Sequence, residues 1–229
     1  LIRLKTQIVD MSRKIAKHED FEDVDDVKIN EGKIKGKTNK QNVEQFIAFW
    51  RPTDPYGYMG QWHRSNFTLT QDTCDAFPDE IKNLPLYKEQ FHVLEWLIEQ
   101  EEFNTAEKFM MMGKAALFRC RPAFNRMSAT DDPSAQKKLG RQVTGFDDDT
   151  WNKYCCDIVK IGNYLKFTQD ETLKRELKST GSAVLIEGSP LDKIWGVGLK
   201  FDDPRIMNKR LWQGTNYLGI CLMFVRDLL

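Results

Sequence analysis

Two carboxylates and a tryptophan lie close together in one short stretch, LIEGSPLDKIWGVGL, residues 185–199. Glu187 and Asp192 are five positions apart, and Trp195 follows the aspartate by three positions. Paired carboxylates are the groups that general acid–base chemistry uses, and a tryptophan offers a flat face to a base or a sugar. The stretch therefore has the residue types of an active-site wall.

The same stretch also has a purely structural interpretation. Ser189 and Pro190 suit the N-cap and the first position of a helix, and Asp192 would then be able to reach back to the cap. Glu187 would be a strand-end carboxylate that nearby amides satisfy. Local sequence alone favours this second interpretation, and both stay open at this point.

Glu107 and Lys114 form a second candidate group, because residues seven positions apart share one face of a helix. Met110 and Met111 lie between them, on or near that face. Unpaired charges are costly in a dry core, so a face that lines a pocket would explain this mixture. An amphipathic helix with two ordinary charges at its edge explains it as well, and spacing alone favours that explanation.

Trp151 follows a run of three aspartates in FDDDTW, which suits the N-terminus of a helix through the macrodipole. Its ring is either part of the core or a stacking face for a base or a sugar. Motifs of several other enzyme classes are missing from the sequence, which has no G-x-S-x-G, no Walker A and no G-x-G-x-x-G.

The bulk composition excludes several classes of protein. The 229 residues carry 34 basic and 34 acidic side chains, so the general charge of a non-specific nucleic-acid binder is missing. Three widely spaced histidines and five cysteines without a C-x-x-C pair argue against a metal site and a disulfide framework. No apolar run reaches membrane-spanning length and no signal peptide is visible, so we expect a reducing, cytoplasmic location, or the nucleus in a eukaryotic cell.

The elements that must position these residues are mostly helices. FIAFW and SAVLIEG predict short strands. Helices are predicted over NTAEKFMMMGKAALF with Thr105 as N-cap, and over DDPSAQKKLGRQV, DDDTWNKYCCDIVKIGNYLKF and NYLGICLMFVRDLL. TQDETLKRELKSTG predicts another helix, with Thr168 as its cap and Gly181 as its end. Because strands and helices do not alternate regularly, we expect a mostly helical α+β fold rather than a doubly wound one.

The first 43 residues differ from the rest of the chain. Apolar residues recur at three- and four-residue steps through residues 1–15, which predicts a helix with one apolar stripe. Residues 19–43 have the composition of a polar linker or an exposed hairpin. We therefore expect an N-terminal helical extension on a domain formed by 44–229, docked on that domain or, alternatively, bound to a partner through residues 1–18.

Several phrases together resemble the YbiA-like or NADAR family, in order and in spacing. They are NTAEKFMMMGKAALF, KKLGRQVTGFDDDTWNKYCCDIVKIGNYLKFTQDETLKRELKSTG, LIEGSPLDKIWGVGL and LWQGTNYLGICLMFVRDLL, with GQWHRSNF as a weaker match. The resemblance covers about residues 44–69 and 103–229. Residues 70–102 look like an insertion that could reshape the substrate entrance, and residues 1–43 have no counterpart.

The resemblance implies a compact, mostly helical α+β domain with N-glycosidase activity. Members of the family cleave the ribosyl–nitrogen bond of early riboflavin-pathway intermediates, or remove ADP-ribose from modified guanine bases in nucleic acid. The family's catalytic glutamate falls on Glu107, its site aspartate and tryptophan on Asp192 and Trp195, its upstream tryptophan on Trp151 and its helix lysine on Lys114.

The matched phrases also contain Trp62, Arg141 and Asn216, which we assign to substrate binding. The resemblance implies neither a cofactor nor a metal. It leaves open whether water or Lys114, as a covalent nucleophile, attacks the sugar. A binding module that holds ADP-ribose or a nucleotide without cleaving it is the alternative function.

The nature of the substrate depends on local charge. A substrate linked to DNA or RNA needs a basic rim, whereas a small ribosyl compound does not. Two clusters could form such a rim, or could equally be solvated helix charges: Lys137, Lys138 and Arg141, and Lys209 with Arg210.

Overall fold

The computed structural model describes residues 45–229. The N-terminal helix, the linker and the partner-binding surface expected over residues 1–43 lie outside the described residues. Within residues 45–229, no helix is long and apolar enough to cross a membrane.

Two short strands form a parallel pair, β1 (Phe46–Phe49) and β2 (Val184–Glu187), and both were predicted from their apolar runs. Their register places Phe46 beside Val184 and Phe49 beside Glu187. A parallel pair needs a long crossover, and here most of the helices lie between the two strands in the chain. Because the strands are parallel, the loop after β1 and the turn after β2 leave the sheet at the same edge.

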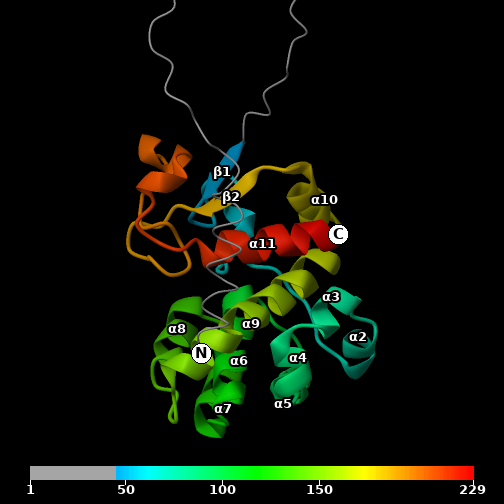
Figure 1. Ribbon diagram of the computed structural model, residues 1–229. Coiled ribbons are helices and arrows are strands. Elements are labelled where there is room, and N and C mark those ends of the chain that lie inside the picture. The colour runs from blue at the N-terminus through cyan, green and yellow to red at the C-terminus, as the bar shows by residue number, and fades with distance from the viewer. Residues whose placement is uncertain (1–44) are drawn as a thin grey trace, which may run out of the picture. The chain divides into compact units, whose positions relative to one another are not determined.

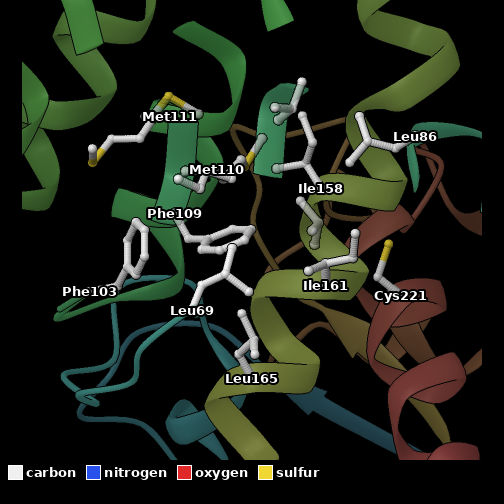
Figure 2. Close-up of a cluster of buried hydrophobic side chains, with 14 of the residues drawn as sticks. Leu69, Leu86, Phe103, Phe109, Met110, Met111, Ile158, Ile161, Leu165 and Cys221 are labelled. Carbon is white, nitrogen blue, oxygen red and sulfur yellow. The ribbon is translucent and has the colours of Figure 1, made fainter. Parts of the chain in front are cut away.

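The helical part is built around α6 (Ala106–Leu117) and α9 (Asp148–Thr168), which pack against each other. Figure 2 shows Phe109 and Met110 of α6 facing Ile158 and Ile161 of α9 in one apolar cluster. The two helices approach closely at Gly162, where an added Cβ would lie 2.7 Å from the Phe109 ring. Buried apolar side chains between these helices therefore hold α6 in a fixed position.

The remaining helices surround this pair (Figure 1). Helices α5, α7 and α8 pack on α6, while α10 and α11 pack on α9, and α11 also covers β2. Their bounds are α2 (Gln71–Asp75), α3 (Asp79–Lys82), α4 (Pro85–Glu89), α5 (His92–Ile98), α7 (Arg121–Ser128), α8 (Pro133–Gly140), α10 (Glu171–Ser179) and α11 (Tyr217–Leu228). Three short 3-10 helices are η1 (Gly57–Met59), η2 (Pro204–Met207) and η3 (Lys209–Leu211).

Most of the predicted helix limits are confirmed, and one cap is wrong. The Thr105 hydroxyl accepts from the Lys108 amide at 3.1 Å, as expected of the N-cap of α6. Helix α10 is capped by Asp170, whose carboxylate accepts from two amides, and not by Thr168. Thr168 is the last residue of α9, and its hydroxyl donates to the carbonyl of Tyr164 within that helix. Helix α7 was not predicted.

Residues 70–102 fold into four short helices, α2 to α5. Pro85 stands at the start of α4, where a missing amide hydrogen costs nothing. The amide of Leu86 donates to Asp157 of α9 at 3.2 Å, so this segment is tied to the central helix pair. That it is an insertion relative to the family stays a prediction.

Candidate active site

Glu107 lies in the first turn of α6 and is only 5% exposed. Its amide donates to the carbonyl of Gln61 at 3.0 Å, so the loop after β1 runs alongside this turn. The pKa of Glu107 is raised to about 7, mainly by burial and to a smaller extent by the nearby Asp192. Lys137 and a hydrogen bond from the Trp62 indole act in the opposite direction. Glu107 can therefore exchange a proton near neutral pH.

Two buried side chains of α9 hold the loop that follows β1. The Lys166 ammonium donates to the carbonyls of Tyr58 and Gly60, at 2.6 and 3.0 Å. The Asn163 amide donates to the side-chain oxygen of Gln61 at 2.9 Å. Lys166 is fully buried, and burial lowers its pKa to about 7. These bonds hold the part of the loop that comes just before Trp62, whose indole donates to Glu107.

Glu187 is the last residue of β2. Its Oε2 atom is buried without a hydrogen-bond partner among the described residues, so the expectation that amides satisfy it is wrong for this oxygen. The pKa of Glu187 is raised to about 8, mainly by burial, with smaller increases from Asp192 and Glu107 and a partly opposing decrease from Lys137. The two glutamates and the aspartate therefore share one electrostatic environment.

The turn after β2 contains no helix, which corrects the expectation that Ser189 and Pro190 begin one. Asp192 does not reach back to a cap. Its carboxylate accepts from the amides of Ile194 and Trp195, at 3.0 and 2.8 Å, and so closes the turn ahead of it. A short aspartate side chain that satisfies amides two and three residues on is a common turn-forming device. Asp192 thus serves its backbone while its charge acts on both glutamates.

The N-terminus of α11 fixes this turn in place. The amides of Tyr217 and Leu218 donate to the carbonyls of Ile194 and Trp195, at 3.2 and 3.1 Å. The rings of Trp195 and Tyr217 meet edge to face, with centroids 6.1 Å apart. Because the first amides of a helix need acceptors from outside it, these bonds satisfy α11 and the turn together.

Asn216, expected to bind substrate, is 1% exposed and bonded to the backbone of β2. Its side-chain oxygen accepts from the amide of Glu187 at 3.0 Å, and its nitrogen donates to the carbonyl of Leu185 at 2.8 Å. Its φ of 55° is in the left-handed region, which asparagine tolerates better than most residues. These contacts make Asn216 a residue that orients Glu187.

Lys114 belongs to a different group of side chains, two helical turns farther along α6. Its ammonium lies 4.0 Å from the ring centroid of Phe146 and 5.2 Å from that of Trp151. Burial lowers the pKa of Lys114, and the charge of Asp148 opposes that change. The structure therefore joins Lys114 with Trp151, as a cation over aromatic faces.

Helix α6 is buried on nearly every side, which differs from both interpretations of the sequence. Met110 and Met111 are 5% and 7% exposed, so they are core residues rather than the lining of a pocket or one stripe of an amphipathic helix. Met110 also accepts a weak hydrogen bond from Gln61 at 3.7 Å. The carboxylate of Glu107 is therefore held by a rigid, central element.

Of the expected basic rim, Lys137 is the residue that acts on the carboxylates. It is an exposed side chain of α8, and its charge favours ionisation of Glu107 and of Glu187. Lys138, the next residue, lines a groove between α7 and α8 together with Arg126. Arg141 is exposed at the end of α8. Lys209 and Arg210 lie on η3.

The carboxylates do not form a metal centre of the usual kind. In residues 45–229, no group of three or more histidine, cysteine, aspartate or glutamate side chains is arranged to hold a metal ion. Instead, the titratable carboxyl groups of Glu107 and Glu187 lie near the Trp62 indole and the exposed cation of Lys137.

Comparison with known proteins agrees with this architecture. The family model described as the NADAR domain matches residues 48–229. N-glycosidase R617 of Acanthamoeba polyphaga mimivirus is 39% identical over 126 residues, which are 55% of this chain and 74% of the relative. N-glycosidase Npun_R5314 of Nostoc punctiforme is 29% identical over 127 residues, 56% of this chain and 70% of the relative.

The same fold is seen in a solved structure. The NMR structure of the Escherichia coli protein YbiA superimposes with a TM-score of 0.56 at 19% identity, covering 83% of this chain and 89% of that chain. The expected mostly helical α+β domain is thereby confirmed as YbiA-like over the described residues, with two short parallel strands.

Proposed function

The chain belongs to the NADAR domain family, and on that premise we propose that it is an N-glycosidase that hydrolyses a ribosyl–nitrogen bond. One observation carries the proposal: a buried glutamate of the central helix, Glu107, lies with Trp62, Glu187 and Asp192 at the edge where both strands end. Two relatives with N-glycosidase in their names support the reaction class.

The chemistry suits these residues. Cleavage of a ribosyl C1–N bond builds positive charge on the sugar carbon, and a carboxylate next to that carbon stabilises the charge or takes a proton from water. Glu107 fits this role, because a buried carboxylate interacts with a developing charge more strongly than an exposed one. Asp192, whose carboxylate already closes the turn, is proposed to bind ribose hydroxyls with its second oxygen.

We propose a substrate that carries phosphate as well as a ribosylated base. Lys137 is an exposed cation beside the carboxylates, and Lys138 extends the positive charge along α8. Trp62 is 41% exposed and Trp195 is half-buried, so both have ring surface that a base or a ribose can cover. ADP-ribosylated guanine, free or in DNA or RNA, and a ribosylaminopyrimidine phosphate are the two candidates.

A panel of these compounds tests the proposal. Purified protein is incubated with ADP-ribosylated guanine DNA, the free ADP-ribosyl nucleoside and ribosylaminopyrimidine phosphate, and the released base is measured by chromatography. We expect one of them to be hydrolysed by the wild type and by the exposed-residue control Glu101→Gln, but not by Glu107→Gln. Thermal stabilisation by a panel member without any product would instead support the binding-module alternative.

A further inference from the structure

One oxygen of Glu187 is in an unusual position for a carboxylate. The residue keeps some exposed surface, yet its Oε2 atom is buried and finds no donor in the part of the chain that the structure describes. Buried polar atoms almost always have a partner, and an ionised carboxylate oxygen without one is especially costly. Such an unpartnered atom in a well-packed site requires a physical explanation.

A proton on Glu187 lowers this cost, because an unpaired neutral group is much less costly to bury than an unpaired charge. A neutral carboxyl group has an O–H that can donate, and it does not need the several donors that a carboxylate requires. The charges around it agree: Asp192 in the turn and Glu107 on α6 both disfavour a negative charge here, and of the residues that the structure describes only Lys137 on α8 favours one. The β1 side, Phe46–Phe49, is apolar, and α11 contributes the Asn216 amide rather than a charge.

We propose that Glu187 is the acid of the reaction, a carboxyl group that gives its proton to the base nitrogen as the ribosyl bond breaks. This inference rests on the proposed N-glycosidase function and assigns the second reactive group of that same site. Asn216 positions Glu187, because its side-chain oxygen accepts from the Glu187 amide at 3.0 Å and its side-chain nitrogen donates to the Leu185 carbonyl at 2.8 Å.

Cleavage of the C1–N bond and the addition of water together conserve protons. The C1–N bond breaks and its electron pair goes to the base nitrogen, which takes the proton from the Glu187 carboxyl group. Water then adds to C1 and gives a proton to the Glu107 carboxylate, so the products are the free base and the sugar with a new hydroxyl group. Glu107 is left protonated and Glu187 ionised, and one proton passed from the first to the second through solvent restores the start.

This assignment predicts how activity varies with pH. The acid must be protonated and the base ionised, so activity rises as Glu107 loses its proton and falls as Glu187 loses its own. The pKa values of about 7 and about 8 place a narrow optimum between them, and the two values that a measured pH profile yields will belong to the coupled pair.

The test compares Glu187→Gln with the wild type on two substrates that share the ADP-ribosyl group. A guanine-linked base needs a proton to leave, whereas the pyridinium of nicotinamide adenine dinucleotide leaves without one. We expect Glu187→Gln to lose about 10²- to 10⁴-fold on the guanine-linked substrate and less than about tenfold on the dinucleotide. Glu107→Gln should lose both activities, and Glu101→Gln neither.

A second measurement uses the best substrate alone. In Glu187→Gln, the fall in kcat/KM at alkaline pH should disappear. Wild-type rates in the variant, or an equal loss on both substrates with an unchanged pH profile, would overturn the assignment, because a purely structural role predicts one of these.

If the wild type hydrolyses nothing in the panel, the proposed function fails and Glu187 is not an acid of that reaction. The melting temperature still decides whether it holds a proton. Glu187→Gln should raise the melting temperature at pH 9 and leave it unchanged at pH 4. An equal change at both pH values would show that Glu187 holds no proton.

Discussion

Replacing Glu107 with glutamine should make the protein more stable at alkaline pH while it removes the activity. The side chain is 5% exposed in the first turn of the central helix, and glutamine preserves its size and its oxygen for the Trp62 indole. The change removes only the ability to ionise. The variant should therefore gain stability and lose activity, as expected where a functional residue carries a charge that destabilises the folded protein.

The size of the effect follows from the pKa of Glu107. Burial raises it from 4.5 to about 7, and one pKa unit corresponds to about 1.4 kcal/mol. Ionising this group in the folded protein therefore costs about 3 kcal/mol more than ionising it in the unfolded chain. The helix macrodipole favours the charge by only about 0.3–1 kcal/mol, so burial decides the sign.

The pH window follows from the direction of the shift. A group whose folded pKa is raised contributes stability that is complete below its unfolded value and is lost as pH rises through its folded value. Wild-type stability should therefore fall between about pH 4.5 and pH 7 by an amount that the variant does not lose. At pH 8 the variant should melt on the order of 10 °C higher, since 1 kcal/mol moves a domain of this size by about 2–4 °C.

The assay is thermal or urea unfolding of the wild type and Glu107→Gln from pH 4 to pH 9, with Glu101→Gln as the control. Glu101 is exposed, so its variant should follow the wild type at every pH. A Glu107→Gln curve parallel to the wild type across this range would show that Glu107 ionises normally, and the argument from burial would then be refuted.

Three further outcomes are expected. Trp62→Phe removes the donor that lowers the pKa of Glu107, so the acid limb of kcat/KM should move to higher pH; an unmoved limb would contradict this contact. Lys114→Arg keeps a cation but cannot form an imine; with water as the nucleophile, borohydride should trap no glycosyl adduct on either protein, and a borohydride adduct on the wild type that the variant lacks would assign the attack to Lys114. Gly162→Ala should cost about 1–3 kcal/mol in urea unfolding, because its Cβ would lie 2.7 Å from Phe109; a neutral result would show that this contact relaxes.

Much of the fold follows from local patterns in the sequence. Both strands and the longest helices are signalled by apolar runs, by caps such as Thr105 and by breakers such as Gly181. The error at the start of α10 arose because Thr168 and Asp170 are both good caps, and sequence does not show that Thr168 still belongs to α9, where its hydroxyl donates to the Tyr164 carbonyl. Helix α7 was missed since Pro122, in its first turn, looks like a breaker in sequence.

The sequence supplies candidate site residues, but it does not show which of them meet through tertiary contacts. Glu107, Asp192 and Trp62 come together in one environment, while Lys114 and Trp151 form another. The resemblance assigns a role to Asp192 and none to Glu187, and sequence cannot show that the Glu187 Oε2 atom lacks a partner. Lys166 was not singled out at all, since a lysine within a long helix is ordinarily exposed and nothing local signals its burial.

The separation of these two groups bears on the nucleophile. Glu107 and Lys114 are seven residues apart, which is about 10.5 Å along a helix axis, and the contacts described for the lysine are aromatic rings and Asp148. If Lys114 attacks C1, the amine must first be neutral, and its lowered pKa favours that. The base still departs with a proton whether water or an amine replaces it. The role proposed for Glu187 therefore does not depend on the nucleophile, and the leaving-group test and the borohydride test are independent of each other.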